Sequence, residues 1–302
     1  MLPLFTMVCL LASSLSFGAQ VVQIGPEDRT ALLQLAEGPE KRPLVLVLHG
    51  FGMDAESIDQ FFNARRGAEQ VNYHALIPEG RVNQDGARFW AATDACCDFF
   101  GPEKSDTDVN YLMELVHEAV RSYPVRKNEI YIVGFSNGGF MANRLACEYS
   151  NVFEGVASFA GANYRDIAQC QPKRALSYLQ VHGTVDAVIG YDGGSTPKAA
   201  YPSARATTDY WAGFNRCKNE IATSEAFELS QFNLDLNAGL PSDEELPQYF
   251  DPGNETDQLL FDNCRGRHQV ALWTMNGLGH APLYLENILV QALDFIAKPM
   301  VK

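Results

Sequence analysis

The stretch YIVGFSNGG, residues 131–139, decides the fold, because an apolar β-branched run passes directly into Gly-x-Ser-x-Gly and then into helix-forming residues. A serine on such a strand-to-helix turn has its side chain pushed out at the end of the sheet. Gly134 and Gly138 suit a turn too sharp for a Cβ. The helix expected from Met141 to Tyr149 aims its N-terminal N–H groups at the same point. The pattern predicts that Ser136 is a nucleophile, and the alternative is a tight turn without chemistry.

A second apolar run, LVLVL at residues 44–48, ends in HGFG at residues 49–52. A strand that is apolar on both faces belongs in a buried parallel sheet. Its glycine-rich exit can turn a backbone N–H toward the serine, and acyl transfer needs two such donors for the tetrahedral oxyanion. We expect these donors to be Phe51 or Gly52, together with Asn137. The ring of His49 is expected to be structural.

A third strand, expected at residues 177–181, is followed by His-Gly-Thr-Val-Asp, which ends at Asp186. This places an acid just beyond the carboxyl end of a strand, where open α/β sheets build their sites. Asp192 is the competing acid, but it lies in an Asp-Gly-Gly sequence that is first a turn signal. The strand-end position favours Asp186.

The last expected strand, residues 270–274, is followed by a loop that contains His280. The chain order Ser136, Asp186, His280 is that of α/β-hydrolases and differs from those of chymotrypsin and subtilisin. In this interpretation Ser136 attacks the acyl carbonyl, His280 is the general base and acid, and Asp186 fixes the imidazole tautomer. Three other histidines compete weakly: His74 and His117, expected to be structural, and His268, expected to be exposed.

The whole sequence fits one α/β domain with a mostly parallel central sheet flanked by helices. The chain has 302 residues, of which 46% are hydrophobic, enough for one large core. Strands are expected near residues 19–24, 43–48, 72–77, 129–133, 154–159, 176–181 and 269–274. Helices are expected near residues 55–68, 106–123, 138–149, 203–215 and 283–297.

At this point the motifs resemble a known family, the secreted esterases of the polyhydroxybutyrate-depolymerase-like group, which includes feruloyl esterases. The resemblance runs from about His49 to the C-terminus. It implies a serine carboxylic-ester hydrolase of the α/β-hydrolase fold that uses no metal and no organic cofactor. The motifs that carry the resemblance are His49-Gly50, Trp90 to Cys97, residues 134–139, residues 182–186 with Gly193-Gly194, and residues 279–282.

The resemblance also places Trp90 near the mouth of the pocket, where an aromatic ring could stack against a planar acyl group. The alternative is that Trp90 packs the loop against the core. Two features depart from the family pattern: an acidic loop at residues 231–257 that is longer, and Ala281-Pro282 in place of an aromatic residue after the histidine. Both could reshape the leaving-group side of the pocket.

Residues 1–18 form an apolar run with small residues near its end, which predicts a cleaved signal peptide ahead of a single domain at residues 19–302. The run lacks a basic start, and a retained anchor is the alternative. An even set of cysteines follows it, which favours disulfides and a secreted, extracellular or periplasmic protein. The fifteen pairings of Cys96, Cys97, Cys147, Cys170, Cys217 and Cys264 stay open, including a vicinal disulfide or two buried thiols at Cys96-Cys97.

The net charge of −14 argues against nucleic acid or an anionic membrane as a partner. No histidine or cysteine spacing predicts a metal site. The sequence therefore predicts a secreted serine esterase that acts on small or polymeric substrates, either hydroxycinnamoyl esters or short-chain acyl and hydroxyalkanoate esters. A peptidase or amidase with the same triad and a noncatalytic binding member of the fold are the alternatives. The sequence does not indicate an oligomeric state.

Overall fold

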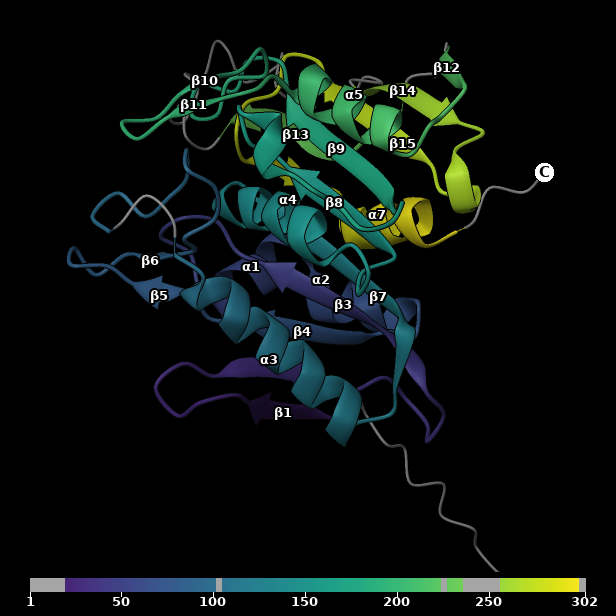
Figure 1. Ribbon diagram of the computed structural model, residues 1–302. Helices are drawn as coiled ribbons and strands as arrows, with labels where there is room; N and C mark the ends of the chain where they lie inside the picture. Colours follow the sequence, from purple (N-terminus) through teal and green to yellow (C-terminus); the bar gives the residue numbers. More distant parts are fainter. Residues whose placement is uncertain (1–19, 102–104, 224–226, 236–255, 299–302) are drawn as a thin grey trace, which may run out of the picture.

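The computed structural model describes residues 20–101, 105–223, 227–235 and 256–298. Its centre is a ten-stranded sheet in the order β1-β2-β4-β3-β7-β8-β9-β15-β14-β12 (Figure 1). The six central strands, from β4 to β15, pair in parallel, and antiparallel strands complete both edges. The expected fold, a mostly parallel sheet flanked by helices, is confirmed.

The strands of this sheet are β1 (Val21–Ile24), β2 (Ala31–Gln34), β3 (Arg42–Leu48), β4 (His74–Pro78), β7 (Val125–Phe135), β8 (Gly155–Phe159), β9 (Ser177–Gly183), β12 (Asn219–Ala222), β14 (Thr256–Asp262) and β15 (Val270–Met275). Three two-stranded pairs are formed by β5 (Arg81–Val82) with β6 (Arg88–Phe89), β10 (Gly194–Ser195) with β11 (Ala200–Tyr201), and β13 (Ser230–Asp235) with β16 (Pro282–Tyr284). The helices are α1 (Ala55–Phe62), α2 (Ala64–Gln70), α3 (Thr107–Ser122), α4 (Asn137–Tyr149), α5 (Ala204–Phe214) and α7 (Ile288–Ala297), with short 3₁₀ turns at Ile167–Gln169 and Arg265–Arg267.

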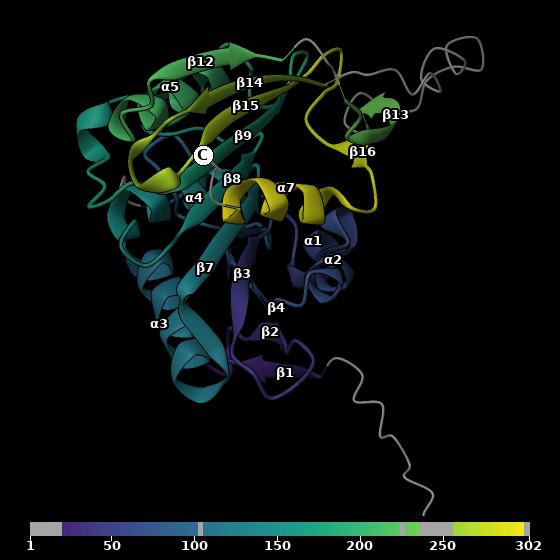
Figure 2. The ribbon, with the colours of Figure 1, turned by 90° about the vertical axis from the view of Figure 1, so that its right-hand side faces the viewer.

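Helices cover both faces of the sheet: α3, α4 and α5 lie on one face, and α1, α2 and α7 lie on the other (Figure 2). Side chains of β3 alternate between the two resulting cores. Leu44, Leu46 and Leu48 join the first core, whereas Val45 and Val47 join the second. This is why β3 reads as an unbroken apolar run, since neither face meets water.

The structure differs from the sequence prediction at several element ends. The helix expected over residues 55–68 is two helices, because Asn63 adopts a left-handed conformation with φ of 50° and ends α1. The expected C-terminal helix begins at Ile288 rather than near residue 283. Pro282–Tyr284 instead pair with β13 as a short strand. The antiparallel strands β2, β12 and β14 were not predicted. β2 and β12 have only four residues each, too few for a clear alternation of apolar and polar side chains.

Three disulfides link Cys96 to Cys97, Cys147 to Cys170, and Cys217 to Cys264. The second ties the end of α4 to the loop that leads into β9, and the third ties the end of α5 to the segment after β14. The predicted signal peptide, residues 1–18, and most of the acidic loop lie outside the described residues. Within the part of the chain that is described, no helix is long and apolar enough to cross a membrane.

The Cys147–Cys170 disulfide is expected to stabilise the fold. It closes a loop with a sequence separation of 23 residues. In the chain-entropy view such a loop is worth roughly 3 kcal/mol, because the crosslink restricts the unfolded chain. The double substitution Cys147→Ala/Cys170→Ala should therefore lower the melting temperature and the free energy of unfolding measured in urea. Free thiols at both positions in the natively produced protein, found by non-reduced peptide mapping, would contradict this pairing.

Candidate active site

The turn between β7 and α4 holds Ser136 in a conformation that few non-glycine residues adopt, with φ of 52° and ψ of −118°. The backbone around it is tightly packed. A Cβ on Gly134 would collide with the carbonyl group of Gly138, and a Cβ on Gly138 would collide with that of Leu48. Both glycines are thus required by close approach of the backbone, as expected for a serine presented on a strained elbow.

Ser136, His280 and Asp186 lie in one hydrogen-bonded row. His280 Nε2 is 2.9 Å from Ser136 Oγ, and His280 Nδ1 is 2.7 Å from Asp186 Oδ2. The three residues follow β7, β15 and β9, whose carboxyl ends meet at one edge of the sheet because these strands and β8 run parallel. All three are buried, with at most 8% of their surface exposed. The structure therefore brings together residues that are far apart in the sequence, in the geometry of a nucleophile, a base and an orienting acid.

Asp186 accepts hydrogen bonds on both carboxylate oxygens. The backbone N–H groups of Val188 and Ile189 donate to Oδ1, at 2.9 and 2.8 Å. Oδ2 faces His280 and also His182, whose Nε2 lies 3.3 Å away. Burial acts to raise the pKa of the Asp186 carboxyl, but the hydrogen bonds from His182 and His280 outweigh it and hold the pKa far below its usual range. Asp186 is consequently a carboxylate that can orient His280.

Asp192, the competing acid, lies exposed in a turn, and the structure does not bring it into the row. Among the remaining histidines, His74 is buried between the Ala36 N–H and the Pro124 carbonyl, as expected for a structural residue. His117 lies on an exposed face of α3 rather than at a structural contact, and His268 is half-buried rather than exposed. His182, which contacts Asp186, was not singled out from the sequence.

The backbone N–H groups expected to form an oxyanion site lie at the start of α4 and in the turn after β3. Asn137 is the first residue of α4, and the first N–H groups of a helix have no partner within it. On the other side, the Gly52 N–H donates to the Arg88 carbonyl at 2.8 Å. Of the two candidates after β3, Gly52 therefore has its N–H paired within the protein, and Phe51 remains the candidate donor.

His49 supports the turn that carries Phe51. Its Nδ1 donates to the Gly50 carbonyl at 2.7 Å, and its Nε2 accepts from the Gly80 N–H at 2.9 Å. Burial lowers the pKa of the His49 ring to about 4. The ring is therefore neutral near pH 7 and structural, as the sequence predicts.

Trp90 is enclosed between His49 and Asn137. Its side chain is completely buried, and its indole N–H donates to the His49 carbonyl at 2.9 Å. Its backbone N–H and carbonyl pair with the side-chain amide of Asn137, at 2.7 and 2.9 Å. No face of the indole is open to an acyl group, so the placement agrees with the packing alternative. Trp90 thus holds the loop before Cys96 against Asn137, the residue after Ser136.

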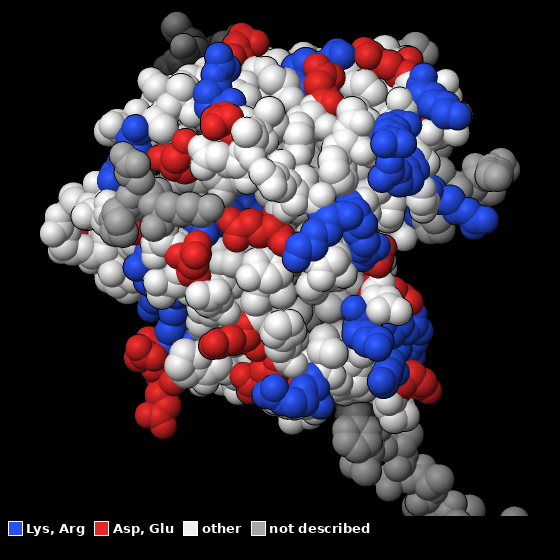
Figure 3. All heavy atoms as spheres, in the orientation of Figure 1, with Lys and Arg blue, Asp and Glu red and all other residues white. Residues whose placement is uncertain are grey.

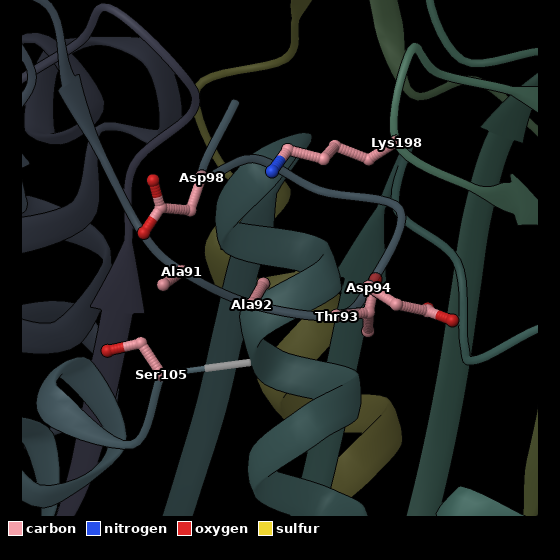
Figure 4. A pocket seen from close by; sticks show the side chains of 7 residues that line it. All are labelled: Ala91, Ala92, Thr93, Asp94, Asp98, Ser105 and Lys198. Atoms are coloured by element: carbon pink, nitrogen blue, oxygen red, sulfur yellow. The ribbon is translucent and has the colours of Figure 1, made fainter. Parts of the chain in front are cut away.

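A hollow beside the 91–98 loop has room for about one water molecule, and it includes none of the residues discussed above (Figure 4). It is lined by Ala91, Ala92, Thr93, Asp94, Asp98, Ser105 and Lys198. On the face shown in Figure 3, acidic and basic side chains are interspersed. Among the described residues, no group of three or more histidine, cysteine, aspartate or glutamate side chains could hold a metal ion.

The sequence profile of the phospholipase/carboxylesterase family matches residues 35–211. The chain belongs to this family, which is part of the α/β-hydrolase superfamily. The match includes Ser136 and Asp186 but ends before His280.

The chain is also similar to curated proteins that are named as esterases or as a depolymerase. NocK from Nocardia uniformis, named as an esterase, is 34% identical over 214 residues, covering 70% of this chain and 58% of its own length. Feruloyl esterase B of Piromyces equi is 28% identical, covering 60% of this chain and 30% of its own length. The poly(3-hydroxybutyrate) depolymerase of Ralstonia pickettii is 30% identical, covering 59% and 33%. The matches thus span between about a third and somewhat over half of these relatives.

Among solved structures, the acetyl xylan esterase from Aspergillus awamori is similar with a TM-score of 0.61, over 92% of this chain and 98% of the other. The sequences are 12% identical, so this likeness concerns the fold. It covers nearly the whole of both chains.

Proposed function

We propose that the chain hydrolyses carboxylic esters with Ser136 as nucleophile, His280 as general base and acid, and Asp186 as the orienting carboxylate. The observation that carries the proposal is the row of two hydrogen bonds, 2.9 Å from Ser136 Oγ to His280 Nε2 and 2.7 Å from His280 Nδ1 to Asp186 Oδ2. A serine hydroxyl is a weak nucleophile at neutral pH, and an adjacent base held in the correct tautomer is the standard way to activate it.

The proposed reaction has two halves. His280 removes the proton from Ser136 Oγ as this oxygen attacks the ester carbonyl, and it returns the proton to the leaving alcohol as the acyl-enzyme forms. Water then attacks the acyl-enzyme as His280 takes its proton. The bond from the acyl carbon to Ser136 Oγ breaks, His280 returns the proton to this oxygen, and the acid product leaves. The N–H groups of Phe51 and Asn137 would donate to the oxyanion in both tetrahedral intermediates.

For the acyl group we propose hydroxycinnamoyl esters or short-chain acyl and hydroxyalkanoate esters. Support comes from the names of the relatives, a feruloyl esterase and a poly(3-hydroxybutyrate) depolymerase. Trp90 is completely buried, whereas Phe51, whose N–H is one proposed oxyanion donor, is 39% exposed. An aromatic acyl group could pack against Phe51. We further propose that the protein is exported, since its six cysteines after residue 18 are paired in disulfides.

The test is a panel of p-nitrophenyl acyl esters beside methyl ferulate, a hydroxybutyrate oligomer and matched anilides. We expect hydrolysis of at least one ester class, with kcat/KM for the matched anilide lower, because the amide leaving group needs protonation before it departs. Faster turnover of the anilides would indicate the peptidase or amidase alternative. Tight binding of an ester without turnover would indicate a noncatalytic binding protein.

A further inference from the structure

Strand β9 carries a row of polar side chains in the interior of the protein. Tyr178, Gln180 and His182 occupy every second position, so they project from the same face of the sheet. Each is at most 1% exposed. Buried polar groups are costly unless they are hydrogen-bonded, so a row of this kind needs a complete set of partners.

The partners fix how Gln180 is oriented. Its Nε2 lies 2.8 Å from the carbonyl oxygen of Gly161, which can only accept, so the amide nitrogen must face that atom. Its Oε1 lies 2.7 Å from the Tyr178 hydroxyl, whose single hydrogen can serve either this oxygen or Asn143 Oδ1 at 2.9 Å, so the Gly161 contact decides the orientation. The second hydrogen of Nε2 then points to His182 Nδ1, 3.2 Å away.

This contact sets the tautomer of His182. Because Nδ1 accepts from Gln180, the proton of a neutral ring must be on Nε2. Nε2 lies 2.7 Å from the Ile189 carbonyl oxygen and 3.3 Å from Asp186 Oδ2. Both are acceptors, so the single N–H of His182 faces the acid and the loop that carries it. The Ile189 N–H in turn donates to Asp186 Oδ1 at 2.8 Å.

We propose that His182 is a positioning residue for Asp186. Held as the Nε2–H tautomer by Gln180, it fixes the loop between Gly183 and Ile189 and turns Asp186 Oδ2 toward His280 Nδ1. The inference rests on the proposed function, because it assigns a role to His182 only if Asp186 orients a catalytic histidine. His182 itself touches neither Ser136 nor the expected position of the substrate.

A matched pair of amide substitutions tests the inference. In His182→Gln the side-chain nitrogen can reach the place of imidazole Nε2 and donate to Ile189 and Asp186. In His182→Asn the shorter amide reaches only the place of Nδ1. We expect His182→Asn to lower kcat on a p-nitrophenyl ester by about tenfold to 10²-fold with little change in KM, because small misplacements of a catalytic group have effects of this size. We expect His182→Gln to stay within about threefold of the wild-type kcat, since it restores the donor.

A stability control separates positioning from simple packing. His74→Asn removes a fully buried strand histidine whose hydrogen bonds go to the backbone of Ala36 and Pro124. It should lower the melting temperature without changing kcat per active site, counted by labelling with a fluorophosphonate. If His182→Asn also lowers only the melting temperature, or if the Asn and Gln variants have the same kcat, the inference is overturned.

Failure of the proposed function would look different from failure of this inference. If the wild-type enzyme is not labelled at Ser136 and Ser136→Ala keeps full turnover, the triad assignment fails, and the role of His182 fails with it. If wild-type labelling and the loss of activity in Ser136→Ala are both as expected, equal kcat values in the two His182 variants count against the positioning role alone.

Discussion

Ser136→Ala is expected to lower kcat on a p-nitrophenyl acyl ester by about 10⁴-fold or more, because it removes the oxygen that forms the acyl-enzyme. The residual activity would come from the Phe51 and Asn137 N–H groups and from substrate binding, which do not depend on the serine hydroxyl. Steady-state kinetics with active-site counting give the measurement. The melting temperature should change little, since alanine keeps the Cβ that the elbow already accommodates.

Ser195→Ala is the matched control, because Ser195 is an exposed serine on β10, outside the proposed site. Its kcat should equal that of the wild-type enzyme. Near-normal activity of Ser136→Ala, or a large loss in Ser195→Ala, would contradict the assignment of the nucleophile.

Asp186→Asn is expected to lower kcat by up to about 10⁴-fold while the fold is retained. Every partner of the Asp186 carboxylate is a donor: Val188 N and Ile189 N on Oδ1, and His182 and His280 on Oδ2. An asparagine has one acceptor oxygen, so its NH₂ group must face a donor in either orientation. If the NH₂ group faces His280, the histidine adopts the tautomer with its proton on Nε2, which cannot accept the proton of Ser136.

Asp192→Asn serves as the comparison, since Asp192 is exposed in a turn. It should leave kcat nearly unchanged. A reversal of the two effects in the same ester assay would show that the acid was assigned to the wrong aspartate.

The candidate triad could be predicted from the sequence because each member has a local signal. Gly134 and Gly138 leave a visible spacing around Ser136, and Asp186 and His280 each follow a strongly apolar strand. The chain order Ser, Asp, His then distinguishes the α/β-hydrolase arrangement from those of chymotrypsin and subtilisin. The glycine spacing, the strand-end positions and the chain order are all local or linear features of the sequence. They predict the triad without knowledge of which strands are neighbours in the sheet.

The burial of Trp90 and the orientation of His182 could not be predicted, because both depend on contacts between segments that are distant in the sequence. Trp90 pairs with Asn137 and His49, and nothing in the local sequence around residue 90 indicates burial by these partners. His182 precedes Asp186 by four residues in sequence, yet its tautomer is decided by Gln180, which is oriented by the Gly161 carbonyl of the loop after β8. The sequence signals were the place of His182 at the start of the 182–186 motif and the alternation of Tyr178, Gln180 and His182 along β9. Neither signal indicates which loop atoms orient the ring.

The most direct test of the central claim is to label the wild-type protein with a fluorophosphonate and to map the modified peptide by mass spectrometry. The account predicts one label per chain, on Ser136, with no label on Ser136→Ala and much slower labelling of Asp186→Asn, because the reaction requires a serine activated by an oriented histidine. Labelling at another serine, or equal labelling rates in the wild-type protein and Asp186→Asn, would contradict it.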